Sequence, residues 1–304
     1  MPNLFEYAVE QKTLTIGDVK IGGLPGRNAT VVIPSIFYSK DSLVRNAQTG
    51  DIDKKATDDV LNMLSEIGEK TGLPTMLDVV ASTPRAMEEY LTYLADACSF
   101  PLLIDGSGDG AVNAAGILRA KEAGLLERVV LNSLTPDTGD DLYIVVRETG
   151  LQNALLLTFA TNAITSVTKR VELADQLIKR AHENGLTDLL LDTGVLDLLT
   201  LGVACKAQMV LKDKYGFPVG SGAHNAVSTW RGLVPKFGED AKMPASVGAS
   251  LIPVALGADF VLIGPAKAAT TVYPSIAMVD TVLSGSLLED RIRPERPHPR
   301  YKIS

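Results

Sequence analysis

The sequence predicts an α/β protein whose eight strand–helix units close into a (β/α)8 barrel. Short apolar runs alternate eight times with longer amphipathic segments. The helical segments end at a glycine or at a turn rich in Lys and Arg, and the next apolar run begins soon afterwards. This alternation is typical of parallel strands covered by helices. The length of 304 residues suits one barrel of roughly 250 residues with additions.

The elements follow in order along the chain. Residues 14–23, "LTIGDVKIGG", alternate apolar and polar side chains around Gly17 and Asp18, which predicts a β-hairpin that plugs one end of the fold. Eight strands are expected within 30–38, 74–82, 101–108, 128–135, 153–162, 187–194, 218–225 and 258–268. Helices are expected at 54–72, 84–99, 110–124, 140–150, 168–185, 198–216, 243–257 and 271–285.

We expect one domain over residues 1–304, with an N-terminal hairpin extension at 1–28 and a C-terminal tail at 289–304. The tail is rich in Pro and Arg and is not expected to be helical. It either lies on the surface or covers a neighbouring subunit. A doubly wound open sheet is the alternative fold, but no Gly-x-Gly-x-x-Gly follows the first strand, and "DGSGDG" follows the third. A dinucleotide site is therefore not expected.

Composition restricts the possible partners. The formal charge of -7 and the pI near 5.1 do not favour binding to nucleic acid. No signal-like leader or membrane-spanning apolar run is evident, so we expect a cytoplasmic protein.

Cys98 and Cys205 are isolated and lack Cys or His companions at metal-ligand spacing, so we expect buried thiols and no metal.

Polar residues follow the predicted strands where they leave the core. In "TDLLLDTG", for example, three leucines suit a strand buried on both faces, and Asp192 stands at its end. The carboxyl ends of barrel strands meet at one mouth, where function resides. The residues expected there are Asp78, Asp105, Asn132, Asn162, Asp192, His224 and Asn225.

Carboxylates and amides suit a neutral heterocycle with several N–H donors. A carboxylate accepts two parallel N–H groups and an amide offers one donor and one acceptor, which matches a 2-amino-4-oxo pyrimidine such as a pterin. The alternative for each residue is capping of the following helix. A phosphate site at Gly220–Gly222 and a Schiff-base role for Lys267 are further alternatives, although the acids would repel an anion.

The sequence resembles the H-subunit family of tetrahydromethanopterin S-methyltransferase and its bacterial homologues. The resemblance rests first on "IGDVKIGGLPG" and "ATVVIPSIFYSKD" and extends across nearly the whole chain. Within the family, the functional match that the resemblance implies is the bacterial methylcobalamin:tetrahydrofolate methyltransferase of glycine betaine demethylation. The family is related to pterin-binding barrels such as dihydropteroate synthase, so the resemblance implies a barrel of the pterin-binding type.

The resemblance also implies roles for particular residues. Related barrels hold the pterin with residues that match Asp105 in "LLIDGS", Asn132 in "VVLNS" and Asp192 in "LLLDTG". Methyltransferases of this kind add an Asn that matches Asn225 in "GSGAHNAV", and the adjacent His224 leaves open which side chain reaches the ring. Asp78 and Asn162 stay possible further mouth residues.

The implied reaction moves a methyl group from methylcobalamin to tetrahydrofolate without a metal in the enzyme. No Asp-x-His-x-x-Gly corrinoid motif occurs in the sequence, so a partner corrinoid protein is expected to carry the methyl donor. The relatives also suggest a homodimer. A non-catalytic scaffold subunit that docks a corrinoid protein is one alternative. A dihydropteroate synthase activity is another, but "IGPAK" lacks the strand-seven Lys and terminal Arg-x-His arrangement that this enzyme requires for its diphosphate.

Overall fold

Eight parallel strands form a closed barrel in the computed structural model, which describes residues 4–304. The barrel strands are β3 (Val31–Ile36), β6 (Leu77–Val80), β7 (Leu102–Asp105), β8 (Val129–Leu134), β9 (Asn153–Leu157), β10 (Asp188–Asp192), β11 (Val219–Ser221) and β12 (Phe260–Pro265). Neighbours in the chain are neighbours in the barrel, and β12 pairs in parallel with β3 to close it. The predicted fold class is confirmed.

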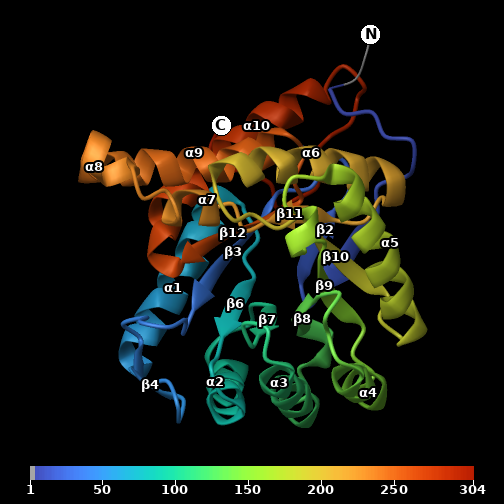
Figure 1. The fold of residues 1–304 in the computed structure, drawn as a ribbon. Coiled ribbons are helices and arrows are strands. Elements are labelled where there is room, and N and C mark those ends of the chain that lie inside the picture. The colour runs from blue at the N-terminus through green and yellow to red at the C-terminus, as the bar shows by residue number, and fades with distance from the viewer. Residues whose placement is uncertain (1–3) are drawn as a thin grey trace.

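Helices follow one another around the outside of the strands, as the colour sequence in Figure 1 shows. They are α1 (Lys54–Thr71), α2 (Pro84–Ala97), α3 (Gly110–Glu122), α4 (Asp140–Thr149), α5 (Val167–Glu183), α6 (Leu198–Tyr215), α9 (Lys242–Ala255) and α10 (Ala269–Ser286). Several begin at a side-chain cap, and α1, α4 and α6 end at a left-handed glycine, the conformation that disfavours a Cβ. None of the helices described here combines the length and apolar character needed to cross a bilayer.

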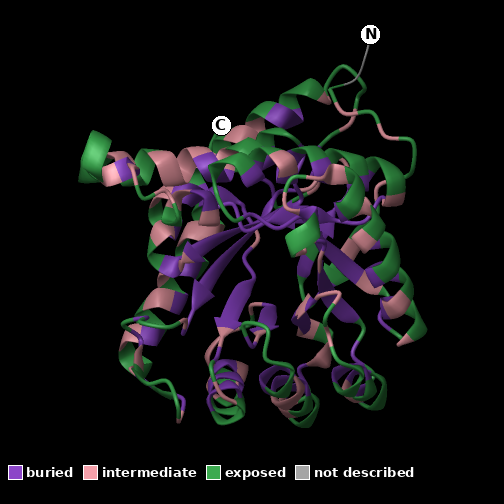
Figure 2. Ribbon diagram, viewed as in Figure 1, coloured by how far each residue is buried: buried purple, intermediate pink, exposed green. Residues whose placement is uncertain are grey.

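The barrel interior is a separate apolar layer, which Figure 2 shows as buried strands at the centre. Its members are Val31, Ile33, Met76, Leu103, Val130, Leu155, Leu190, Phe260 and Leu262. The predicted hairpin, β1 (Thr13–Ile16) and β2 (Val19–Gly22), packs Ile16, Val19 and Ile21 against this layer. It therefore plugs one end of the barrel, as expected from the sequence.

The C-terminal tail packs on its own chain. Glu295 forms ion pairs with Lys20 of the hairpin at 2.8 Å and with Arg27 at 3.2 Å. His298 is fully buried, and its backbone lies against Gly72 at the end of α1. A short 3-10 helix at Pro299–Tyr301 follows.

Some elements were not predicted. A two-stranded ladder of β4 (Val44–Asn46) and β5 (Asp51–Ile52) lies between β3 and α1. Two short helices, α7 (Asn225–Ser228) and α8 (Leu233–Phe237), occupy the long connection between β11 and α9. This connection begins directly after the seventh barrel strand and forms part of the mouth.

Candidate functional site

A cavity of about 600 Å³ opens at the carboxyl ends of the barrel strands. Side chains alternate along a strand, so the position two residues after an inward-facing core residue also faces inward, nearer the mouth. Leu103, Val130 and Leu190 belong to the inner core, and two residues further along come Asp105, Asn132 and Asp192. Met76 precedes Asp78 in the same way. Strand register therefore brings four of the predicted polar residues into one cavity above the apolar layer.

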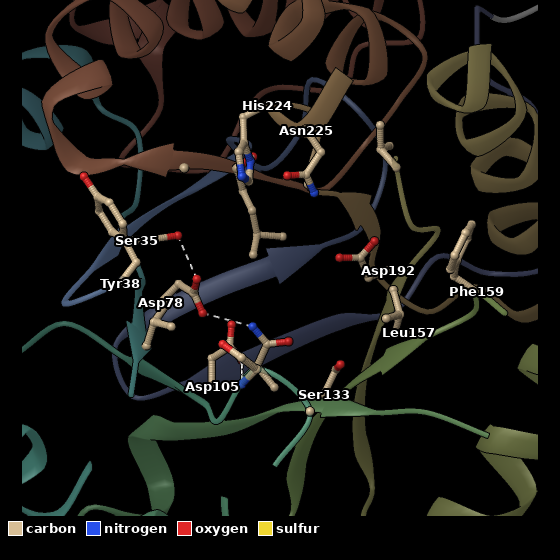
Figure 3. A pocket seen from close by; sticks show the side chains of 18 of the residues that line it. Ser35, Tyr38, Asp78, Asp105, Ser133, Leu157, Phe159, Asp192, His224 and Asn225 are labelled. Carbon is tan, nitrogen blue, oxygen red and sulfur yellow. Dashed lines mark hydrogen bonds between the residues drawn. The ribbon is translucent and has the colours of Figure 1, made fainter. Parts of the chain in front are cut away.

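Asp78 is the centre of a buried hydrogen-bond cluster, drawn in Figure 3. Its carboxylate accepts from the Ser35 hydroxyl at 2.7 Å and from the Asn132 side-chain amide at 2.9 Å. Burial raises the pKa of Asp78, and these two hydrogen bonds act in the opposite direction. Asp78 thus fixes the orientation of the Asn132 amide, because Nδ2 must be the group that donates to it.

Two further acids line the cavity: half-buried Asp105, which lies beside Asp78, and buried Asp192 (Figure 3). Burial and the charge of Asp78 raise the pKa of Asp105 to about 7. Burial raises the pKa of Asp192 to about 6. Each carboxylate accepts one backbone N–H, from Ser107 at 2.6 Å and from Gly194 at 2.7 Å respectively. The remaining acceptor positions of both carboxylates are available to a ligand.

Helix capping does not account for these residues. The side chains that cap α3 and α6 belong to Asp109 and Asp197. Thr83 caps α2, and Gly139 occupies the N-cap of α4. The capping alternative is therefore wrong for Asp78, Asp105, Asn132 and Asp192.

Arg170 on α5 organises the backbone behind Asp192. It is fully buried and its guanidinium donates to the backbone carbonyls of Ala163, Ile164, Thr193 and Gly194. It also lies 5.1 Å from the ring centroid of Phe159, a cavity residue. Arg170 thus ties the loop after β9 to the loop after β10, and its positive charge lowers the pKa of Asp192 against the effect of burial.

His224 and Asn225 enter the cavity from the side opposite Asp105 (Figure 3). The Nδ1 atom of His224 lies 3.0 Å from the carbonyl oxygen of Leu262. A carbonyl only accepts, so Nδ1 carries the proton, and Nε2 of the neutral ring is an acceptor. Burial lowers the pKa of His224, which favours this neutral form. Within residues 4–304, no group hydrogen-bonds to the side-chain amide of Asn225, which points toward the cavity.

Three other candidates, Asn162, Lys267 and Gly220, do not line the cavity. Asn162 is exposed in a 3-10 helix after β9 and is not among the lining residues. Lys267 is also exposed and lines a neighbouring pocket instead, so it is not positioned as a Schiff-base lysine of the mouth. Gly220 packs so closely on Phe260 that a Cβ would meet its carbonyl oxygen at 2.1 Å, which gives this glycine a packing role.

Sequence reasoning missed several lining residues. Ser35, Tyr38, Ser107 and Phe159 all contribute to the cavity. Ser35 could have been predicted from the alternation of its strand, because it stands two residues after Ile33 of the inner core. Tyr38, Ser107 and Phe159 lie after the ends of their strands, where strand alternation no longer predicts which way a side chain points.

Within residues 4–304, the lining combines three carboxylates with amide and hydroxyl groups and contains neither lysine nor arginine. Among the described residues, no group of His, Cys, Asp and Glu has the arrangement of a metal site. Such a lining suits an uncharged ligand that presents several N–H donors to acids.

Comparisons with known proteins find relatives of the sequence and of the fold. The model of the family described as tetrahydromethanopterin S-methyltransferase MtrH subunit matches residues 9–294. The H-subunit of tetrahydromethanopterin S-methyltransferase from Methanocaldococcus jannaschii is 32% identical, with 99% of this chain and 100% of that protein covered. Its counterpart from Methanothermobacter thermautotrophicus is also 32% identical, with the same coverage. A Yersinia pestis dihydropteroate synthase structure shares the fold, with a TM-score of 0.62 at 15% identity over 90% of this chain and 100% of that one.

Proposed function

Because the chain belongs to the tetrahydromethanopterin S-methyltransferase MtrH subunit family, a family of methyltransferase subunits, we propose that it is an enzyme that methylates a tetrahydropterin. The proposed methyl donor is methylcob(III)alamin and the proposed acceptor is ring nitrogen N5 of tetrahydrofolate. The products are methyltetrahydrofolate and cob(I)alamin. The acceptor nitrogen forms the new N–C bond and loses its proton, and the electron pair of the broken Co–C bond stays on cobalt.

The observation that carries the proposal is the acid and amide lining of the mouth cavity. The pyrimidine half of a pterin has an exocyclic amino group, ring N–H and a carbonyl on neighbouring atoms. We assign Asp192 as the acceptor of the amino and ring N–H groups, since its buried carboxylate has acceptor positions left. Asn132, whose Nδ2 is used by Asp78, offers its Oδ1 as an acceptor. Asp105 completes the set of acceptors.

His224 and Asn225 are proposed to act at the methyl-accepting nitrogen. An amide directed at N5 stabilises the positive charge that develops there as the N–C bond forms. The Nε2 atom of neutral His224 is an acceptor for the proton that N5 releases. Neither role requires a covalent enzyme intermediate, so most of the rate enhancement comes from holding the acceptor in position.

A partner corrinoid protein is proposed to deliver the methyl group. The corrinoid supplies an electrophilic methyl group on a good leaving group, and this sequence contains no Asp-x-His-x-x-Gly motif with which to hold it. The open mouth leaves the acceptor accessible from the solvent side, while the inner core and the hairpin seal the opposite end.

The test combines the protein with a methylated corrinoid protein and tetrahydrofolate and follows the corrinoid spectrum. Formation of cob(I)alamin together with methyltetrahydrofolate is expected, and Asp105→Asn should slow it. Asp109→Asn is the matched control, because Asp109 caps α3 outside the cavity and asparagine caps as well as aspartate. Binding of the corrinoid protein without methyl transfer would instead favour a scaffold subunit.

A further inference from the structure

A second pocket, of about 440 Å³, adjoins the mouth cavity. We call it the outer pocket. It lies between α7, α8, α9, β12 and the residues that follow β12, and its walls include Val227, Trp230, Met243 and Ile263. His224 and Pro265 line both spaces. The two spaces therefore meet at His224 and Pro265.

The two spaces differ in chemistry. The acids Asp78, Asp105 and Asp192 line the mouth cavity, whereas the only charged side chains among the described residues of the outer pocket are Lys242 and Lys267. Lys242 pairs with Glu239 at 2.7 Å. Lys267 is exposed and makes no ion pair within residues 4–304. The outer pocket thus presents apolar walls with a positive rim, which complements a flat ring that ends in a negative group.

A tetrahydropterin coenzyme has this shape. Its side arm leaves the ring at C6, the carbon bonded to N5, and carries first an aryl ring and then anionic groups. If N5 faces His224 and Asn225, the arm leaves the mouth on their side, where the outer pocket begins. Trp230 and Met243 are among the apolar walls that an aryl ring would meet there.

We propose that the outer pocket binds the side arm of the tetrahydropterin, with the aryl ring against Trp230 and the anionic tail at Lys267 and Lys242. This inference rests on the proposed function and extends it, because it assigns the part of the protein that distinguishes one tetrahydropterin coenzyme from another. The pyrimidine half is common to such coenzymes, so selectivity between them belongs to the outer pocket.

Trp230 is the only tryptophan of the chain, so its fluorescence reports on the outer pocket directly. Tetrahydrofolate and 6-methyltetrahydropterin, which lacks the arm, are titrated against the purified protein, and binding is measured in parallel by calorimetry. Both should bind. At equal occupancy, and after correction for absorption by the ligand, tetrahydrofolate should quench Trp230 more strongly than 6-methyltetrahydropterin does.

Two variants test the proposed contact between Lys267 and the anionic tail. Lys267→Ala should raise the dissociation constant for tetrahydrofolate roughly threefold, the size expected for an exposed ion pair, and Lys267→Glu should raise it roughly tenfold. Neither should change the affinity for 6-methyltetrahydropterin. Lys302→Glu is the control of equal charge, because Lys302 is exposed and lines a separate pocket with residues of the hairpin and α1.

The outcomes are distinguishable. Equal effects of Lys267→Glu on both pterins, or no effect on either, would overturn the side-arm assignment and leave the methyltransferase proposal standing. Loss of corrinoid-protein binding in Lys267→Glu with unchanged tetrahydrofolate affinity would assign the outer pocket to the partner protein instead. Failure of the wild-type protein to bind either pterin would reject the proposed function and this inference with it.

Discussion

Asp192→Asn is expected to make the ligand-free protein more stable at neutral pH. Burial raises the pKa of this carboxyl from an ordinary value near 3.8 to about 6, so the folded protein holds its charge at a cost. At about 1.36 kcal/mol for each unit of pKa, that cost is about 3 kcal/mol above pH 6. Asparagine removes the charge, and its Oδ1 can still accept the N–H of Gly194 that Asp192 accepts at 2.7 Å.

The sign of the pH dependence follows from the direction of the shift. Between pH of about 4 and about 6, the folded state holds this proton more tightly than the unfolded state does, so the contribution of Asp192 to stability falls as pH rises. Below about pH 4 the carboxyl is protonated in both states and costs nothing. Urea denaturation from pH 4 to pH 8 should therefore show a stability gain for Asp192→Asn that is largest at pH 7 and vanishes near pH 4.

Pterin binding should change in the opposite direction. Replacing a charged acceptor removes about 1.5–3 kcal/mol of hydrogen-bond energy, which is roughly a 10- to 150-fold loss of affinity. Asp197→Asn is the matched control, since Asp197 caps α6 outside the cavity and asparagine caps equally well. A less stable Asp192→Asn protein that kept its affinity would refute this reasoning and would make Asp192 a structural residue.

Three further predictions concern the rest of the site. Asn225→Ala should lower kcat by about 10²-fold while the pterin dissociation constant changes little, because the interaction is made mainly in the transition state. Single-turnover experiments measure the rate. If Asn225→Ala kept its rate and His224→Ala lost it, the histidine would be the residue that acts on the accepting nitrogen. Arg170→Met should leave four backbone carbonyls without their donor and further raise the pKa of Asp192. The pH midpoint of pterin binding should therefore move upward, and Arg170→Lys should restore it in part. An unchanged midpoint would contradict the electrostatic role of Arg170. Dialysis against a chelator should leave the rate unchanged, and elemental analysis that found one zinc ion per chain would contradict the metal-free mechanism.

Much of the barrel could be predicted from sequence because its strands are buried on both faces. A run such as "LLLD" contains no exposed face, so its length and its end are visible in the apolar pattern alone. The strand ends in turn located Asp105, Asn132 and Asp192, since parallel strands deliver their last residues to one mouth. Helix capping by Asp105 and Asp192 could be excluded only from the structure, which shows that Asp109 and Asp197 are the residues that cap α3 and α6.

Long-range contacts account for what the sequence did not reveal. Arg170 lies in an amphipathic helical segment, and only the fold shows that its side chain is buried among carbonyls from two loops. Asn162 looked like another strand-end amide, but the chain turns into a 3-10 helix there and leaves the side chain exposed. The outer pocket depends on α7, α8 and α9 together, and no local pattern predicts how such short helices pack.

Closure of the barrel by β3 and β12 has a consequence for biosynthesis. These two strands are separated by more than two hundred residues, and one edge of β3 stays without its partner until Phe260–Pro265 has been made. At ribosomal rates of about 5–20 residues per second, that interval is roughly 10 to 45 seconds. During this time Ile16 and Ile21 of the hairpin lack part of the layer that they cover in the finished protein. The nascent chain therefore exposes an apolar hairpin beside an open strand edge, and we expect its yield in cells to depend on chaperones that shield such segments.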